Sequence, residues 1–231
     1  NLEGGLGDIS VKNIQLFYPS TEKITAIKHI NNQDVWVISH EMGNNRFRAY
    51  LVSSSGISTT PVISETGVSH SSGVMNTNAI GCMKVSPNSK KLALAIKHMG
   101  VIEIFDFNNL TGSISNPITI QQPSKNFYGI EFSSDSKLLY VSDMATNNIF
   151  QLNLFYTNAT QLWDHRYKIN SINNTTPGSL QLASNGNIYA SFQHSVYLGV
   201  IHNPNGQGWS CNYEDYGFFL DATNSEFGLP T

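Results

Sequence analysis

Four segments of the chain repeat one pattern: an apolar strand, a short polar turn and a second apolar strand. They occupy residues 27–38, 83–94, 130–141 and 180–190. When His29, Val85, Phe132 and Leu182 are taken as equivalent, the pattern recurs about every 50 residues, with one hairpin in each unit. Such a period is typical of the blades of a β-propeller.

A third alternating strand follows each hairpin, and a weaker, more polar outer strand closes each unit. The third strands cover residues 46–52, 101–107, 148–154 and 196–201, and residues 117–120 illustrate the outer strand. Alternation with a period of two residues, separated by turn residues, indicates β-structure. An α/β fold would need helices between the strands, but the links are short and polar and show no 3.6-residue periodicity.

The pattern therefore predicts an all-β chain that is a β-propeller fragment. Four complete antiparallel blades are expected at residues 24–66, 80–120, 127–170 and 178–231, and residues 1–20 are interpreted as outer strands of a preceding blade. Four blades rarely close a ring, so we expect a portion of a six- or seven-bladed ring, packed against other blades of the same precursor.

Composition excludes some functions. Charged residues make up 13% of the chain, about half the usual share of roughly 25%. The net charge of −3 argues against a nucleic-acid partner, and no apolar run is long enough for a transmembrane segment. Two cysteines, Cys82 and Cys211, are too few for a disulfide framework. We favour two free, buried thiols over the alternative of one bridge.

Several phrases along the chain resemble a known family when they are taken in order. They lie at residues 4–13, 22–29, 36–40, 180–189 and 228–230. Together they resemble the N-terminal propeller region of surface proteins exported by the type IX secretion system, the adhesin-like or gliding-motility-associated group with type B sorting domains. The resemblance implies an extracellular or outer cell-surface location. It also implies binding or display, with a glycan, a surface protein or the secretion machinery as partner, and it brings neither catalytic residues nor a cofactor.

One polar position recurs on the first strand of each repeat, which borders the channel of a propeller. The alignment places Lys28, Lys84, Glu131 and Gln181 there. Polar groups on otherwise apolar strands need partners or water. The favoured interpretation is that these channel-lining residues pair with one another or with water; the alternative is a channel that holds a ligand or an ion.

A second column follows the second strand of each repeat and contains His40, His98, Asp143 and His194. Imidazoles and a carboxylate on one face are possible metal ligands. However, second strands diverge radially from the propeller axis, so we expect four separate loop residues and no bound metal.

Exposed aromatic residues are the better indication of binding. Trp209, Tyr213 and Tyr216 cluster around a glycine-rich turn at residues 205–208. Aromatic rings on a polar surface can stack on sugars or anchor a protein partner. The alternative is that these rings pack against the inner face of the last strand.

No catalytic motif is present. The chain contains no Gly-x-Ser-x-Gly elbow, phosphate loop or His-Glu-x-x-His helix. A lactonase-like propeller hydrolase or lyase would need carboxylates and imidazoles where the first strands begin, at the channel mouth. Those starts, at residues 25–26, 80–81, 127–129 and 178–179, carry neither. We therefore expect a non-enzymatic binding or scaffold module, with such an enzyme as the alternative.

Overall fold

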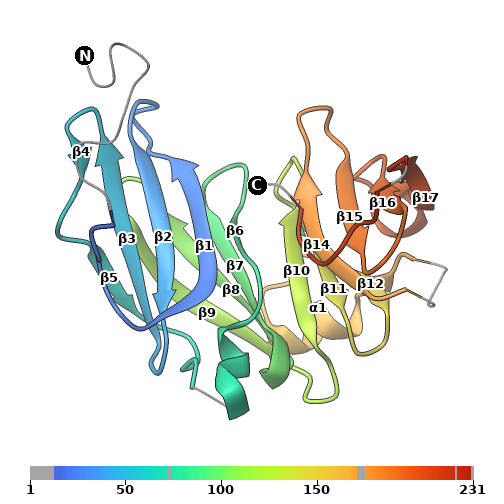
Figure 1. Ribbon diagram of the computed structural model, residues 1–231, viewed down its shortest axis with the longest axis horizontal. Helices are drawn as coiled ribbons and strands as arrows, with labels where there is room; N and C mark the ends of the chain where they lie inside the picture. The colour runs from blue at the N-terminus through green and yellow to red at the C-terminus, as the bar shows by residue number, and fades with distance from the viewer. Residues whose placement is uncertain (1–12, 72–73, 171–174, 222, 230–231) are drawn as a thin grey trace.

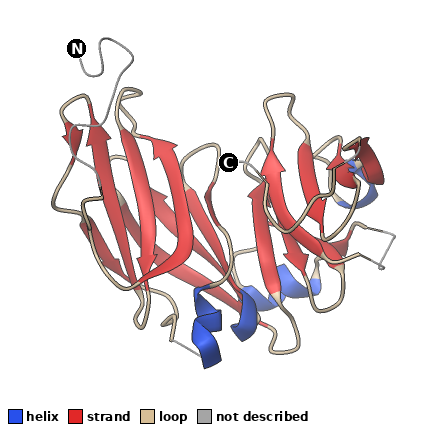
Figure 2. Ribbon diagram, in the orientation of Figure 1, coloured by secondary structure: helices blue, strands red, loops and turns tan. Residues whose placement is uncertain are grey.

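The computed structural model describes residues 13–71, 74–170, 175–221 and 223–229. They form four separate antiparallel sheets with few and short helices. Figures 1 and 2 show the four sheets arranged around a common centre, with the inner strand of each sheet toward the middle. The all-β propeller architecture expected from the repeats is confirmed.

Each sheet follows the chain from its inner strand outward. The first contains β1 (Ser20–Lys28), β2 (Val35–Glu41), β3 (Arg46–Ser53), β4 (Gly56–Ile57) and β5 (Val62–Glu65), and both β4 and β5 pair with β3. The second contains β6 (Met83–Val85), β7 (Lys91–Ile96), β8 (Val101–Asn108) and β9 (Ser113–Gln121). The third contains β10 (Phe127–Phe132), β11 (Leu138–Asp143), β12 (Asn148–Asn153) and β13 (Tyr167–Lys168). The fourth contains β14 (Pro177–Leu182), β15 (Ile188–Phe192), β16 (Tyr197–Ile201) and β17 (Tyr213–Phe219).

Short helices connect some of these strands. They are η2 (Val74–Ala79), η3 (Lys97–Met99), α1 (Ala159–Asp164) and η4 (Gly208–Cys211). None of the helices in the described ranges has the length and apolar run that a membrane-spanning helix requires.

Polar turn residues close the inner hairpins. Ser86 donates its backbone N–H to the Lys91 carbonyl at 2.8 Å, and its side-chain oxygen accepts the Lys91 N–H at 2.9 Å. Ser133 makes the same two contacts with Leu138 in the third sheet, both at 2.9 Å. Hydroxyl side chains that bond the backbone favour turns, which explains why these hairpins form without a Pro-Asp-Gly sequence.

The hairpin register corrects one detail of the repeat alignment. The last paired residue before the turn is Val85, Phe132 or Leu182 in the later sheets, but Lys28, paired with Val35, in the first. His29 already belongs to the turn, because its N–H bonds to the Asp34 carbonyl at 2.8 Å. The alignment of the first repeat is therefore wrong by one residue, and Lys28, not His29, is equivalent to Val85, Phe132 and Leu182. A shift of one residue exchanges the faces of a strand.

The core lies between neighbouring sheets. One apolar cluster joins the first and second sheets, a second joins the second and third, and a third joins the third and fourth. Phe47 and Phe105, for example, meet edge to face across the first junction, with ring centroids 5.0 Å apart. Trp36 is buried at the same junction.

The outer strands expected within residues 1–20 lie largely outside the described residues, which begin at residue 13. Residues 13–19 form no strand, and β1 begins at Ser20. Instead, Phe17 stacks on Tyr50 with ring centroids 6.4 Å apart, and the Arg48 guanidinium lies 5.1 Å from the Phe17 ring. This segment therefore packs on the outer face of the first sheet.

The other end of the described chain returns to the inner strands. The Phe227 carbonyl accepts the Ser179 N–H at 2.7 Å, just as the Tyr128 carbonyl accepts the Cys82 N–H at 3.0 Å. Phe227 and Gly228 thus lie against the fourth sheet as Tyr128 and its following glycine lie against the second. Both cysteines are free, Cys211 buried and Cys82 half-buried.

Candidate active site in the central channel

The inner strands enclose a cavity of about 710 Å³, which we call the channel cavity. Contacts between β1 and β6, β6 and β10, and β10 and β14 place these strands side by side. Most of its wall is apolar, and the residues without a polar side chain are Ile24, Ala26, Ile27, Val37, Gly81, Met83, Val85, Pro87 and Leu182. Polar groups from every sheet interrupt this wall, namely Glu22, Thr25, Cys82, Lys84, Tyr128, Glu131 and Gln181.

Three of the predicted channel residues meet. The Lys84 ammonium donates to Gln181 Oε1 at 2.6 Å and lies 3.5 Å from Glu131 Oε2. They come from β6, β10 and β14, so three consecutive blades contribute to one cluster. Lys84 and Gln181 are half-buried, whereas Glu131 is 5% exposed.

Glu131 is held by the backbone on both sides. Its Oε1 accepts the Phe132 N–H at 2.9 Å, and its Oε2 accepts the Leu182 N–H at 3.0 Å. Burial raises the pKa of this carboxyl above its ordinary value, while Lys84 and the two N–H groups oppose the shift. A carboxyl with a raised pKa next to an ammonium, in a cleft, is a candidate general base.

The channel mouth carries further reactive groups. Glu22, Cys82 and Tyr128 line the cavity there, and Cys82 Sγ lies 3.8 Å from Ser179 Oγ. Burial raises the pKa of both the Cys82 thiol and the Tyr128 phenol. Both therefore remain protonated near neutral pH and can donate a hydrogen bond, but the thiol is a poor nucleophile. The cavity wall near the starts of the inner strands therefore carries a carboxylate, a thiol and a phenol, whereas the sequence predicted neither carboxylates nor imidazoles at these starts.

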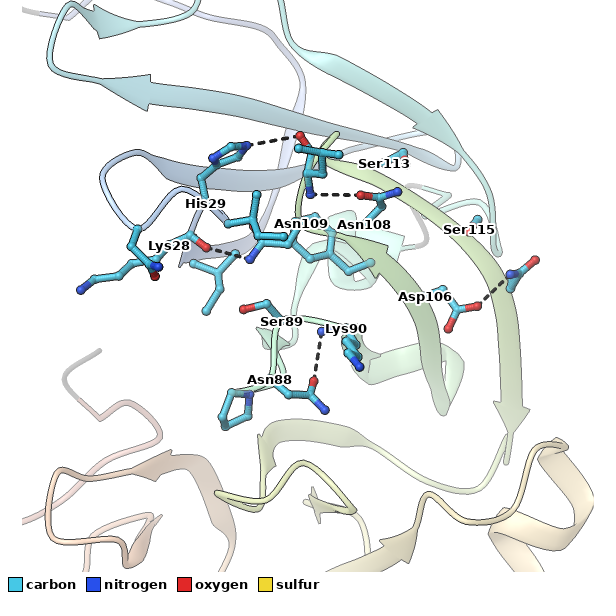
Figure 3. A pocket seen from close by; sticks show the side chains of 17 residues that line it. Lys28, His29, Asn88, Ser89, Lys90, Asp106, Asn108, Asn109, Ser113 and Ser115 are labelled. Carbon is cyan, nitrogen blue, oxygen red and sulfur yellow. Dashed lines mark hydrogen bonds between the residues drawn. The ribbon is translucent and has the colours of Figure 1, made fainter.

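Lys28 does not join the cluster. Because the first repeat is one residue out of step, Ile27 occupies the position of Lys84, Glu131 and Gln181, and Lys28 lies on another surface. That surface is a groove of about 810 Å³ between the first two sheets, beside the hairpin turns. Figure 3 shows Lys28 pointing away from Lys90 and Asp106 in this groove.

The hairpin turns themselves supply most of the polar groups in this groove. Asn109 donates to the Lys28 carbonyl at 2.9 Å, and Asn88 Oδ1 accepts the Lys90 N–H at 3.0 Å (Figure 3). The Asp106 carboxylate accepts hydrogen bonds from the Asn116 side-chain amide at 2.7 Å and from the Lys91 ammonium at 2.6 Å. These contacts stabilise the turns, so the groove offers fewer uncommitted groups than the channel cavity.

The column of His40, His98, Asp143 and His194 is dispersed. His98 is exposed in η3, and exposed His194 pairs with Glu226 at 2.8 Å. Asp143 is fully buried; its Oδ1 accepts the backbone N–H groups of Asn126 and Ala145, and its Oδ2 lies 3.1 Å from the Lys125 ammonium. Within the part of the chain that the structure describes, no three His, Cys, Asp or Glu side chains are grouped to hold a metal.

His40 has a different partner, which sequence spacing did not reveal. Its ring stacks on His70, with centroids 3.5 Å apart and planes 18° apart. Both rings are at most 1% exposed, and His40 Nε2 and both His70 nitrogens lack a hydrogen-bond partner. Burial lowers the pKa of His40 to about 4 and also lowers the pKa of His70. Both imidazoles are therefore neutral at pH 7.

The three aromatic candidates do not form one surface. Trp209 in η4 is 79% exposed, whereas Tyr213 packs against the core between the third and fourth sheets. Tyr216 is 54% exposed and meets Tyr197 with ring centroids 5.3 Å apart. The packing alternative therefore describes Tyr213, and the other two rings remain on the surface.

Comparison with known proteins gives structural likeness only. No protein-family model and no curated protein matches the chain. Among solved structures, virginiamycin B lyase from Staphylococcus aureus aligns with 85% of this chain and 54% of its own, with a TM-score of 0.52 and 14% identity. A putative 6-phosphogluconolactonase from Bacteroides uniformis aligns with 90% of this chain and 55% of its own, with a TM-score of 0.56 and 15% identity.

A second putative 6-phosphogluconolactonase, from Bacteroides fragilis, aligns with 76% of this chain and 52% of its own, with a TM-score of 0.51 and 15% identity. The chain thus spans about half the length of the solved structures that it resembles. What these proteins share with it, at this identity, is the β-propeller fold.

These likenesses correct the expectation of a non-enzymatic module. That expectation rested on the absence of a motif and of reactive groups at the channel mouth. The similar folds belong to proteins named as a lyase and as two putative 6-phosphogluconolactonases. A propeller needs no local motif for catalysis, because its blades bring residues that are distant in sequence to one channel.

Proposed function

We propose that the chain forms the channel wall of a β-propeller enzyme that cleaves a carbon–oxygen bond next to a carbonyl, as a hydrolase or a lyase. The observation that carries this proposal is the cluster of Lys84, Glu131 and Gln181, which three blades direct to one cavity. The names of the similar structures, a lyase and two putative lactonases, agree with this choice of chemistry.

Each residue of the cluster has a distinct role in this proposal. The Lys84 ammonium has three donors, of which Gln181 and Glu131 occupy two, so one remains for a carbonyl oxygen of the substrate. Glu131 accepts a proton, either from an attacking water or from the carbon beside the carbonyl. In the first case water adds to the ester carbonyl, the acyl carbon–oxygen bond breaks and the alcohol leaves with a proton. In the second case the carbon–oxygen bond at the carbon β to the carbonyl breaks, which gives an alkene conjugated with that carbonyl and a carboxylate as the leaving group. The carbonyl oxygen that becomes a tetrahedral oxyanion in the first case, or an enolate oxygen in the second, carries the developing negative charge, and Lys84 stabilises it.

The test is a measurement of ester and lactone cleavage by the purified protein, with phenyl acetate and δ-valerolactone as substrates for hydrolysis and a β-acetoxy ketone as the substrate for elimination. Proton release reports hydrolysis, and ultraviolet absorbance of a new alkene reports elimination. Lys84→Met and Glu131→Gln are expected to lower kcat/KM at least a hundredfold. Lys91→Met, which breaks an ion pair outside the channel, is the matched control. Activity that survives both channel substitutions contradicts the proposal.

The pH profile provides an independent check. Because burial raises the pKa of Glu131, activity should fall on the acid side at a pH above 4.5, the ordinary value for a glutamate.

The location on the cell surface and the resemblance to type IX-secreted proteins stay predictions.

A further inference from the structure

The channel cavity contains one cation, and that cation is already neutralised. Among the described residues that line it, Lys84 is the only basic side chain. Its ammonium is paired with Glu131 and hydrogen-bonded to Gln181. Glu22 adds a second carboxylate at the exposed rim. The formal charge of this part of the wall is therefore −1.

Lys23, which lies close to Cys82, does not change this balance. Lys23 is 0% exposed and is absent from the cavity wall. Its ammonium donates to the carbonyls of Asn78, Ala79 and Ile80 at 3.3, 2.8 and 3.4 Å. Three carbonyl partners use all three of its donors, so Lys23 offers nothing to a ligand in the channel.

An anionic ligand would meet an unfavourable wall here. A phosphate monoester carries a charge of about −1.5 to −2 at pH 7, and it would lose hydration without gaining an unpaired cation. An uncharged ligand avoids this cost, and its apolar part can cover the side chains of Ile24, Met83 and Leu182.

We infer that the channel selects an uncharged, partly apolar carbonyl compound, such as an unphosphorylated lactone or ester, and that Glu131 sets this selection by pairing with Lys84. This inference rests on the proposed function only in treating the ligand as a substrate. The inference distinguishes this chain from an enzyme that acts on a phosphorylated sugar lactone. The phosphate group of such a substrate would need an unpaired cation, and Lys84 is already paired with Glu131.

Binding of a matched pair of probes tests the inference without any turnover. Acetophenone is a neutral carbonyl compound, and phenyl phosphate carries the same ring with an anionic group. Dissociation constants for both probes are measured by calorimetry on the whole protein. We expect the wild type to bind acetophenone at least tenfold more tightly than phenyl phosphate. Glu131→Gln should strengthen phenyl phosphate binding at least tenfold, because it frees the Lys84 charge.

Two further variants make the result decisive. Adding Lys84→Met to Glu131→Gln should abolish the gained phosphate binding. Glu65→Gln removes an exposed carboxylate that pairs with Arg46 outside the channel, and it should leave the ratio unchanged. If Glu131→Gln does not fold, the double variant still decides, because it keeps the formal charge of the wall at −1: the inference requires that it binds phenyl phosphate within about twofold of the wild type, and a tenfold loss overturns it.

The remaining outcomes also count for or against the inference. Wild-type protein that binds phenyl phosphate as tightly as acetophenone, or that binds neither probe, overturns it, and so does an unchanged ratio in folded Glu131→Gln. Selective binding without any bond cleavage contradicts the proposed function alone. Cleavage with a preference for phosphorylated substrates contradicts this inference alone.

Discussion

Two buried groups should give this protein opposing responses to acid. His40 is 1% exposed and its pKa is lowered from 6.5 to about 4, because burial opposes its charged form. Glu103 is also 1% exposed, and burial raises its pKa from 4.5 to about 7, although Thr119 and the Val68 N–H bond to its carboxylate. Each group shifts by about 2.5 units, and one unit corresponds to about 1.36 kcal/mol, so each contributes about 3 kcal/mol.

The two contributions have opposite signs. Unfolded His40 binds a proton near pH 6.5 and folded His40 near pH 4, so its contribution is present above pH 6.5 and is lost as the pH falls toward 4. Folded Glu103 binds a proton near pH 7 and unfolded Glu103 near pH 4.5, so its contribution is present below pH 4.5 and is lost as the pH rises toward 7. Between pH 7.5 and 4.5 the contributions of His40 and Glu103 nearly cancel each other, and buried His70, whose pKa is also lowered, adds to the loss of stability in acid.

Single substitutions should uncover each effect. Urea unfolding, followed by tryptophan fluorescence at pH 7.5 and 4.5, gives the change in the free energy of unfolding on acidification. Relative to the wild type, His40→Gln should be less sensitive to acid by about 3 kcal/mol and Glu103→Gln more sensitive by about 3 kcal/mol. The double variant should return to wild-type behaviour. Shifts in the same direction for both variants, or shifts below about 1 kcal/mol, would refute the assignment of these two groups.

Three further predictions follow from packing and burial. Phe105→Ala, at a fully buried core position, should lower the free energy of unfolding by about 3–5 kcal/mol in urea titrations, whereas Phe155→Ala, at an 83% exposed position, should change it by less than about 0.5 kcal/mol. Gly178→Ala places a Cβ 2.4 Å from a backbone oxygen and should lower the melting temperature, whereas Gly228→Ala meets no atom within 4 Å and should leave it unchanged. The Cys82 thiol, whose pKa burial raises, should react with iodoacetamide at pH 7.5 at least tenfold more slowly than free cysteine, measured by mass spectrometry; equal rates would contradict its burial.

The sequence predicted the architecture because the signals for strands and turns are local. Alternation of apolar residues and the hydroxyl-rich turns at Ser86 and Ser133 specify hairpins without reference to the rest of the chain. The same local signals misplaced the first repeat by one residue. The alignment ended its first strand one residue too late, so it assigned to Lys28 the position that Ile27 occupies. A register error of one residue leaves the blade intact but exchanges its faces.

The site depended on contacts between blades, which no local pattern encodes. The repeat brought Lys84, Glu131 and Gln181 to one position by sequence, but only the packing of three inner strands decided that Lys84 pairs with both of the others. The stacking of His40 on His70 joins a strand end to a loop 30 residues later, and no spacing rule connects them. Sequence determined that this chain builds antiparallel blades, because hairpins are held by near neighbours; tertiary structure decided the chemistry of the channel, because burial and charge pairing arise only when blades meet.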